Sequence, residues 1–151
     1  MVTIRNEILI RRPVDEVFDF VANFENMPKW NYYVKSAVRT THGEHELGAT
    51  FHQIRRHDEQ DFRIVEFDRS HVVAMTTVPP ERKLTMRFSL SPVADGTRLV
   101  DEWAIDAGWA APLVSLARGR IRRAVATNLE KLRELLEDGV TQLPDGRISR
   151  R

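Results

Sequence analysis

Apolar and polar residues alternate at the start of the chain, and the spacing then changes to that of a helix. In the first ten residues the apolar positions are Val2, Ile4, Ile8 and Ile10. This alternation is typical of a strand covered on one face. After Pro13 the apolar residues Val14, Val17, Phe18 and Val21 follow a helical stripe. The pattern predicts a strand and then a short amphipathic helix over residues 13–22.

The middle of the chain, residues 33–106, shows strand patterns and no convincing helix. Short clusters of Gly, Asp, His and Pro separate the apolar runs, as turns do. The expected strands cover residues 33–41, 49–57, 61–67, 71–78, 83–91 and 97–106. Strands this close in sequence pair as antiparallel hairpins.

A long helix is expected at the end of the chain. Pro112 stands near its start, Gly139 stands at its end, and an apolar stripe runs from Val114 to Leu136. Residues 140–151 offer little to bury, so we expect a flexible tail after a single domain over residues 1–139.

Composition excludes several classes of function. The 23 basic and 22 acidic residues leave a net charge of +1, so no basic excess indicates nucleic-acid binding. Cysteine is absent, and the histidines lack the spacing of a metal site, so neither a metal nor a cofactor is expected. No apolar run approaches the roughly 18 residues of a membrane span. A cytoplasmic protein is expected, because the N-terminus has a strand pattern and not that of a signal peptide.

The order of elements and three motifs resemble the START-like or SRPBCC superfamily, in the branch named for polyketide cyclases, dehydratases and lipid transport. The motifs are "ILIRRPVDEVFDFVANFENMPKW", the "GTRL" at Gly96–Leu99 and the helix "RRAVATNLEKLRELLE". The resemblance implies an α+β fold. In that fold a curved antiparallel sheet of about seven strands grips the long C-terminal helix, two short helices follow the first strand, and an apolar cavity lies inside. Members include carriers, enzymes and interaction modules, so the resemblance specifies the fold better than the function.

The resemblance also bears on two aromatic residues. It places the motif "MPKW" where the short helices meet the sheet. Trp30 is therefore expected either to line the pocket or to pack between a helix and the sheet. Polyketide cyclases of the family usually line the pocket with tyrosine and arginine. Tyr32 and Tyr33 are candidates for the tyrosine, but no single arginine matches a catalytic position.

The turn "ADGT" predicts the register of the last hairpin. Asp-Gly is a strong two-residue turn signal, so Ala94 is expected opposite Thr97. The resulting cross-strand pairs are Phe88 with Trp103, Met86 with Ile105 and Leu90 with Asp101. The two apolar pairs indicate that this face lines the cavity, and the same register turns Asp101 inward.

An inward carboxylate needs a charged partner, a raised pKa or a chemical task. Asp101 is therefore either a general acid or base, or a structural carboxylate paired near the wet end of the cavity. Asn128 lies within the apolar stripe of the long helix and either points into the cavity or is a satisfied buried amide.

The loops "HDEQ", "VPPER" and "DAGWAAP" are expected at one end of the sheet, because each joins strands of the same sense. Trp109 in the last loop is either a gate at the cavity mouth or a cap on the core. The basic run "RGRIRR" is either a solvated helix face or a site for an anionic partner.

The sequence leads to two functional hypotheses. In the first, the protein binds a hydrophobic or aromatic small molecule, as a carrier or as an enzyme similar to the polyketide cyclases and dehydratases, and is a monomer or homodimer. In the second, it is a non-enzymatic interaction module that uses the sheet edge or the arginine-rich helix.

Overall fold

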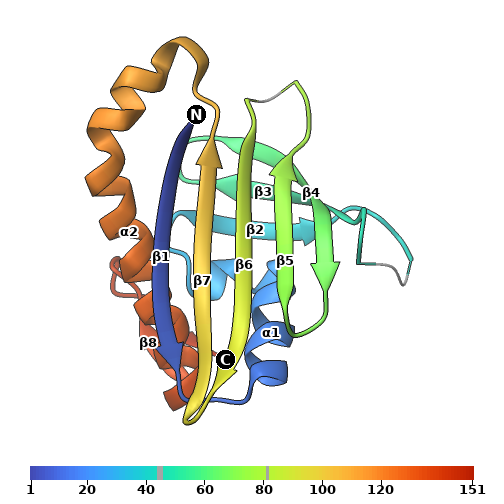
Figure 1. Cartoon of the computed structure of the whole chain (residues 1–151), viewed down its shortest axis with the longest axis vertical. Helices are drawn as coiled ribbons and strands as arrows, with labels where there is room; N and C mark the ends of the chain where they lie inside the picture. The colour runs from blue at the N-terminus through green and yellow to red at the C-terminus, as the bar shows by residue number, and fades with distance from the viewer. Residues whose placement is uncertain (44–45, 81) are drawn as a thin grey trace.

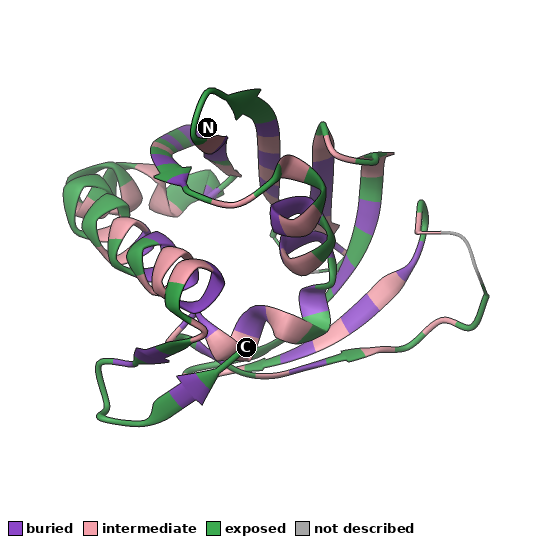
Figure 2. Ribbon diagram, turned by 90° about the horizontal axis from the view of Figure 1, so that it is seen from below, coloured by how far each residue is buried: buried purple, intermediate pink, exposed green. Residues whose placement is uncertain are grey.

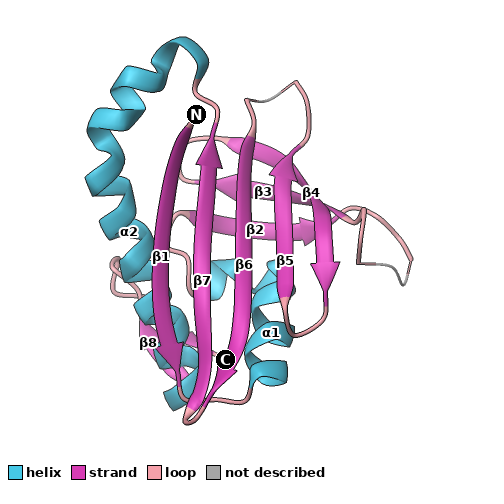
Figure 3. Cartoon of the chain, viewed as in Figure 1, coloured by secondary structure: helices cyan, strands magenta, loops and turns pink. Residues whose placement is uncertain are grey.

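The computed structural model describes residues 1–43, 46–80 and 82–151. Up to residue 139 the strands and helices follow one another in the order that the sequence predicts, and Figures 1 and 3 show their arrangement. In chain order they are β1 (Val2–Ile10), α1 (Val14–Ala22), the 3-10 helix η1 (Phe24–Lys29), β2 (Val34–Arg39), β3 (Thr50–Arg55), β4 (Glu59–Asp68), β5 (Val72–Thr77), β6 (Leu84–Val93), β7 (Gly96–Ile105), the 3-10 helix η2 (Gly108–Ala110), α2 (Ala111–Asp138), β8 (Val140–Gln142) and β9 (Ile148–Arg150).

The predicted main elements are confirmed, with boundaries that differ by at most two residues for the main strands and α1. Within the described residues, seven antiparallel strands form one sheet in the order β1-β7-β6-β5-β4-β3-β2. Its register shifts between Val34 and Ser36, and again between Ile64 and Glu66. Such irregularities bend a strand and increase its twist. They help the sheet curl around the core.

Helix α2 lies across the concave face of this sheet, which gives the α+β helix-grip fold. Its fully buried side chains are confined to the second half of the helix: Val125, Asn128, Leu129, Leu132, Leu135 and Leu136. The first half diverges from the sheet, as Figure 1 shows at the top of the molecule. Buried residues accordingly gather where α1, η1 and the end of α2 face the sheet (Figure 2). The core therefore occupies one end of the fold.

The hairpin of β6 and β7 has a different register from the one predicted. Val93 pairs with Gly96, so the two-residue turn is Ala94–Asp95. The predicted pairs are therefore wrong by two residues: Met86 faces Trp103, and Phe88 faces Asp101. Because side chains alternate with a period of two, this shift leaves every side chain on its expected face. Asp101 still points inward.

Residues 140–151 differ from the flexible tail that we expected. Strands β8 and β9 pair as a small antiparallel hairpin beside the end of α2. The hairpin buries Thr141, Leu143 and Ser149, and Arg151 forms an ion pair with Glu16 of α1. The sequence suggested too little to bury because the alternation spans only three residues in each strand.

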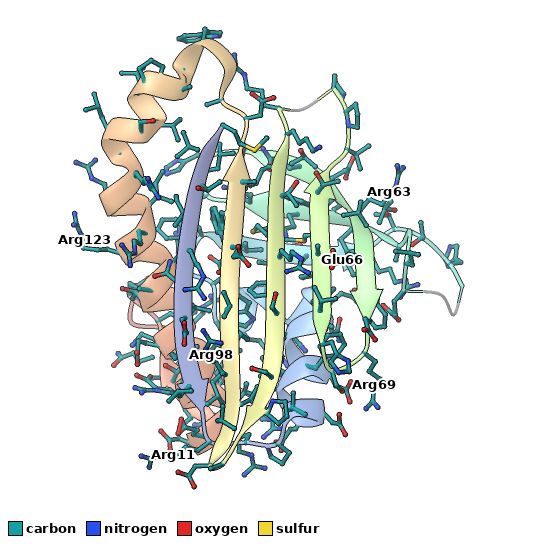
Figure 4. The ribbon with its side chains drawn as sticks, in the orientation of Figure 1. Arg11, Arg63, Glu66, Arg69, Arg98 and Arg123 are labelled. Atoms are coloured by element: carbon teal, nitrogen blue, oxygen red, sulfur yellow. The ribbon has the colours of Figure 1, made fainter. Side chains whose placement is uncertain are left out.

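The convex face of the sheet carries ion pairs between neighbouring strands. Arg98 pairs with Glu7, and Arg87 pairs with Glu66 with 2.8 Å between Nη2 and Oε1. Figure 4 shows Arg98 and Glu66 on this outer face. Exposed pairs of this kind contribute at most about 1 kcal/mol each, so the apolar core on the opposite face dominates stability. None of the helices within the described residues is long and apolar enough to cross a membrane.

A substitution at Gly96 tests the geometry of the β6–β7 turn, and one at Gly119 in α2 serves as its control. A Cβ added to Gly96, at φ 153°, would lie 2.2 Å from the carbonyl oxygen of Ile10, so Gly96→Ala should lower the free energy of unfolding by several kcal/mol through steric overlap. Gly119, in α2, has space for a methyl group. Gly119→Ala should raise that free energy by about 0.5–1 kcal/mol. Urea denaturation measures both. Equal effects of the two changes would contradict the close approach at Gly96.

Candidate functional site

A cavity of about 670 Å³ lies between the first half of α2 and the concave face of the sheet. Its size falls within the range of about 300–1,000 Å³ that is usual for small-molecule sites. The space exists because α2 buries no side chain fully before Val125. Apolar side chains form much of the wall: Met27, Val34, Leu84, Met86, Trp103, Ile105, Val114, Ile121, Ala124 and Val125.

Six of the nine side chains singled out in the sequence line this cavity: Tyr33, Met86, Trp103, Ile105, Trp109 and Asn128. Trp30, Phe88 and Asp101 do not line it and are buried instead. The Trp30 ring packs edge-on against Phe88, with 6.2 Å between ring centroids. Trp30 therefore fastens η1 to the sheet, which is the packing role considered from the sequence.

Three buried amide side chains give the cavity its polar floor. Asn128 Nδ2 donates to Asn31 Oδ1 at 3.2 Å, and Asn31 Oδ1 also accepts from the backbone N–H of Tyr33 at 3.0 Å. Asn128 is thus both a hydrogen-bonded buried amide and a lining residue. Gln53, only 1% exposed, donates from Nε2 to the Met27 thioether at 3.1 Å. Sulfur is a weak acceptor, so this amide retains hydrogen-bonding capacity toward the cavity.

Asn31 and Gln53 were missed from the sequence, although one signal was present. In β3, Phe51 and Gln53 lie two residues apart, and both are buried. Because side chains two residues apart in a strand point to the same face, Gln53 is expected to point inward with Phe51. Asn31 follows η1 in an irregular segment, where no periodicity assigns a face.

Asp101 is buried in the middle of β7 with only 2% of its surface exposed. Its Oδ1 has no hydrogen-bond partner, and none of the ion pairs in the described parts of the chain includes it. Burial raises the pKa of this carboxyl to about 7, the nearby Trp103 indole lowers it in part, and the charge of Glu102 raises it slightly. Of the three possibilities for an inward carboxylate, burial without a charged partner favours a raised pKa.

The rim of the cavity is mostly basic. Arg55, Arg82, Lys83 and Arg120 contribute to it, with Asp106 as the acidic residue among the described lining side chains. The loops "HDEQ", "VPPER" and "DAGWAAP", which were expected at one end of the sheet, each supply a residue to the cavity lining. Glu81, in the second of these loops, lies outside the described residues. Trp109 is 79% exposed and stacks near Arg82, with 5.4 Å from the guanidinium to its ring centroid. Such exposure does not fit a cap on the core.

None of the histidines in the described part of the chain lines the cavity. His52 lies on the outer face, where its Nδ1 is 2.8 Å from Asp61 Oδ1 and its Nε2 is 3.1 Å from Glu59 Oε2. The hydrogen bond to Asp61 is the main cause of a raised pKa at His52. Over residues 1–43, 46–80 and 82–151, no three acidic or histidine side chains are grouped to hold a metal ion.

Comparison with known proteins identifies a family. Residues 1–137 match the family described as "Polyketide cyclase / dehydrase and lipid transport". No curated protein matches the chain significantly in sequence.

Solved structures share the fold at low sequence identity. A START superfamily protein from Mycobacterium smegmatis is 15% identical with a TM-score of 0.72, covering 89% of this chain and 98% of that one. A protein from Mesorhizobium loti is 17% identical with a TM-score of 0.71, covering 94% and 100%. The Aha1 dimer from Colwellia psychrerythraea is 16% identical with a TM-score of 0.68, covering 91% and 97%. These likenesses establish the fold alone.

The raised pKa of Asp101 predicts how stability depends on pH. Its folded-state pKa of about 7 exceeds the ordinary value of 3.8, so the folded state binds the proton more tightly. The stabilisation from this group is complete below about pH 4 and is lost as the pH rises through 7. Asp101→Asn should therefore change the free energy of unfolding little at pH 4 and raise it by roughly 2–4 kcal/mol at pH 8.

Denaturant unfolding between pH 4 and 8 measures this difference. Asp95→Asn, at the exposed turn of the same hairpin, is the matched control and should not reproduce it. A destabilised Asp101→Asn protein at pH 8 would show instead that the carboxylate is charged and paired.

Proposed function

The chain belongs to the polyketide cyclase/dehydrase and lipid transport family, and from this premise we propose that it binds a hydrophobic or aromatic small molecule in the cavity beneath α2. The observation that carries the proposal is the wall of Met86, Trp103 and Ile121 around a space of about 670 Å³. Burying apolar ligand surface against such a wall contributes roughly 25 cal/mol per Å². A pocket with few polar groups favours an apolar molecule and uses those groups to fix its orientation.

The polar floor defines what the inner end of the ligand should carry. Among the described residues, the Met27 thioether is the one acceptor of Gln53 Nε2, and a carbonyl or hydroxyl oxygen of the ligand would be a better one. The Asn31–Asn128 pair is already hydrogen-bonded and holds α2 against the segment before β2. We propose that Gln53 binds a hydrogen-bond acceptor at the inner end of the ligand, while the rest of the molecule lies against the apolar wall.

Non-covalent binding, as by a carrier, is the function that this arrangement favours. Asp101, the carboxylate considered for acid–base chemistry, lies outside the cavity lining. Its pKa of about 7 and the adjacent Trp103, which does line the cavity, are the observations that support a catalytic alternative. In that alternative Asp101→Asn abolishes turnover and leaves ligand affinity intact. For a carrier the same variant binds ligand as the wild type does.

Filling part of the cavity should weaken binding without unfolding the protein. Ala124 lines the cavity and Ala126, two residues later on α2, does not. Ala124→Phe should weaken binding of anilinonaphthalene sulfonate at least about tenfold, a loss of about 1.4 kcal/mol, while Ala126→Phe should bind it as the wild type does. Probe fluorescence and the quenching of tryptophan emission measure both affinities. Unchanged affinity of Ala124→Phe would place the probe elsewhere and remove the support for this cavity.

Trp109 should affect the kinetics of binding more than stability. Its side chain lines the cavity but is 79% exposed, so Trp109→Ala should change the free energy of unfolding by less than about 1 kcal/mol. The on- and off-rates of the probe, measured by stopped-flow fluorescence, should both increase if the indole obstructs the mouth. A loss of stability of 3 kcal/mol or more, roughly that of a truncated core aromatic, would show that Trp109 is structural.

A further inference from the structure

A stripe of side chains, most exposed in its first part, runs from η2 along one face of α2 beside the cavity. Trp109, Leu113 and Leu116 are 79%, 64% and 85% exposed. Arg120 and Arg123 continue the same spacing of four and three residues, which keeps the helical members of the stripe on one face of α2. Single exposed apolar residues are common. Here, three exposed apolar residues follow helical spacing and are followed at the same spacing by arginines. Together they form an amphipathic surface.

This part of α2 is also strongly basic. Four arginines, Arg118, Arg120, Arg122 and Arg123, lie between Asp106 and Glu130, and no acidic residue stands among them. In the described parts of the chain none of these four guanidinium groups forms an ion pair. In the second half of α2, by contrast, Lys131 lies 3.8 Å from Glu134, and Arg133 pairs with Glu130. The positive charge of the first half is therefore not neutralised within the molecule.

We propose that this stripe docks on the surface of an anionic lipid bilayer. Trp109, Leu113 and Leu116 would enter the headgroup region, while the arginines contact lipid phosphates. Arginine suits this position because its apolar stem can lie along the lipid interface with the charged group in the phosphate layer. Three apolar side chains at the tip of a helix are also few for a stable protein interface, which needs roughly 1,000 Å² of buried surface.

Docking in this orientation would turn the cavity mouth toward the bilayer. Trp109 and Arg120 belong to the stripe and also line the cavity. A hydrophobic ligand could then pass between membrane and cavity without crossing bulk water. This last step rests on the proposed function, whereas docking itself requires only the stripe.

Vesicle binding without any added ligand tests the docking. The protein should co-sediment with vesicles that contain phosphatidylglycerol and bind weakly to pure phosphatidylcholine vesicles. Added salt should weaken binding, because it screens the arginines. Trp109 is the most exposed of the tryptophans, so its insertion should shift the emission to shorter wavelength, and Trp109→Phe should abolish that shift.

Two pairs of variants locate the contact. Leu116→Ser should weaken vesicle binding at least about fivefold, whereas Leu9→Ser, 58% exposed on the outer face of β1, should not. Arg123→Glu should weaken it by about fivefold for each unit of charge changed, and Arg63→Glu, the same charge change on β4, by much less. Figure 4 shows Arg123 and Arg63 on opposite sides of the molecule.

Equal binding to neutral and anionic vesicles, or equal effects of the two variants in either pair, would overturn the proposal. So would a homodimer that Leu116→Ser converts to monomer, because the stripe would then bind a second copy of the chain. Probe binding by the same variants in solution separates this outcome from a failure of the proposed function. If the cavity still binds the probe, only the docking is wrong.

Discussion

The packing of α2 on the sheet over half of its length is the constraint on which the other features depend. From Val125 to Leu136 the helix presents a continuous buried stripe to the concave sheet. Truncating one such leucine typically costs about 2–5 kcal/mol, so this half fixes the direction of the helix. In the first half, Val114, Ile121 and Ala124 face the sheet and line the cavity, and this half buries no side chain fully. It cannot close onto the sheet, and the cavity lies in the space between.

The same geometry explains the position of the polar groups. Asp101 lies between the packed core and the cavity, where it is buried and where its Oδ1 has no hydrogen-bond partner among the described residues. Toward the cavity, Asn31, Gln53 and Asn128 supply neutral hydrogen-bonding groups. A neutral floor beneath an apolar wall is compatible with an uncharged, mostly hydrophobic ligand, because no unpaired charge has to be buried when it binds.

Most of the fold could be predicted from the sequence because strand and helix periodicities are long and regular here. The hairpin register could not be predicted. The Asp-Gly signal placed the turn at Asp95–Gly96, one residue beyond the observed turn Ala94–Asp95, and this shifts the cross-strand pairs by two residues. Gly96 instead lies beside the Ile10 backbone. The inward direction of Asp101 was nevertheless right, because a two-residue shift preserves the face. Which inward residues line the cavity depends on where α2 diverges from the sheet. Strand periodicity showed that Phe88 points inward. It could not show that Phe88 packs in the core and does not line the cavity.

We propose above all that the space between α2 and the sheet holds an apolar ligand. A crystal structure of the protein soaked with an iodinated naphthalene sulfonate tests it most directly, because iodine is located by its anomalous signal. We predict iodine density among Met86, Trp103 and Ile121, with a polar group of the ligand within hydrogen-bonding distance of Gln53 Nε2. A cavity closed by α2 and filled with protein side chains, with iodine found only on the outer surface, would contradict it.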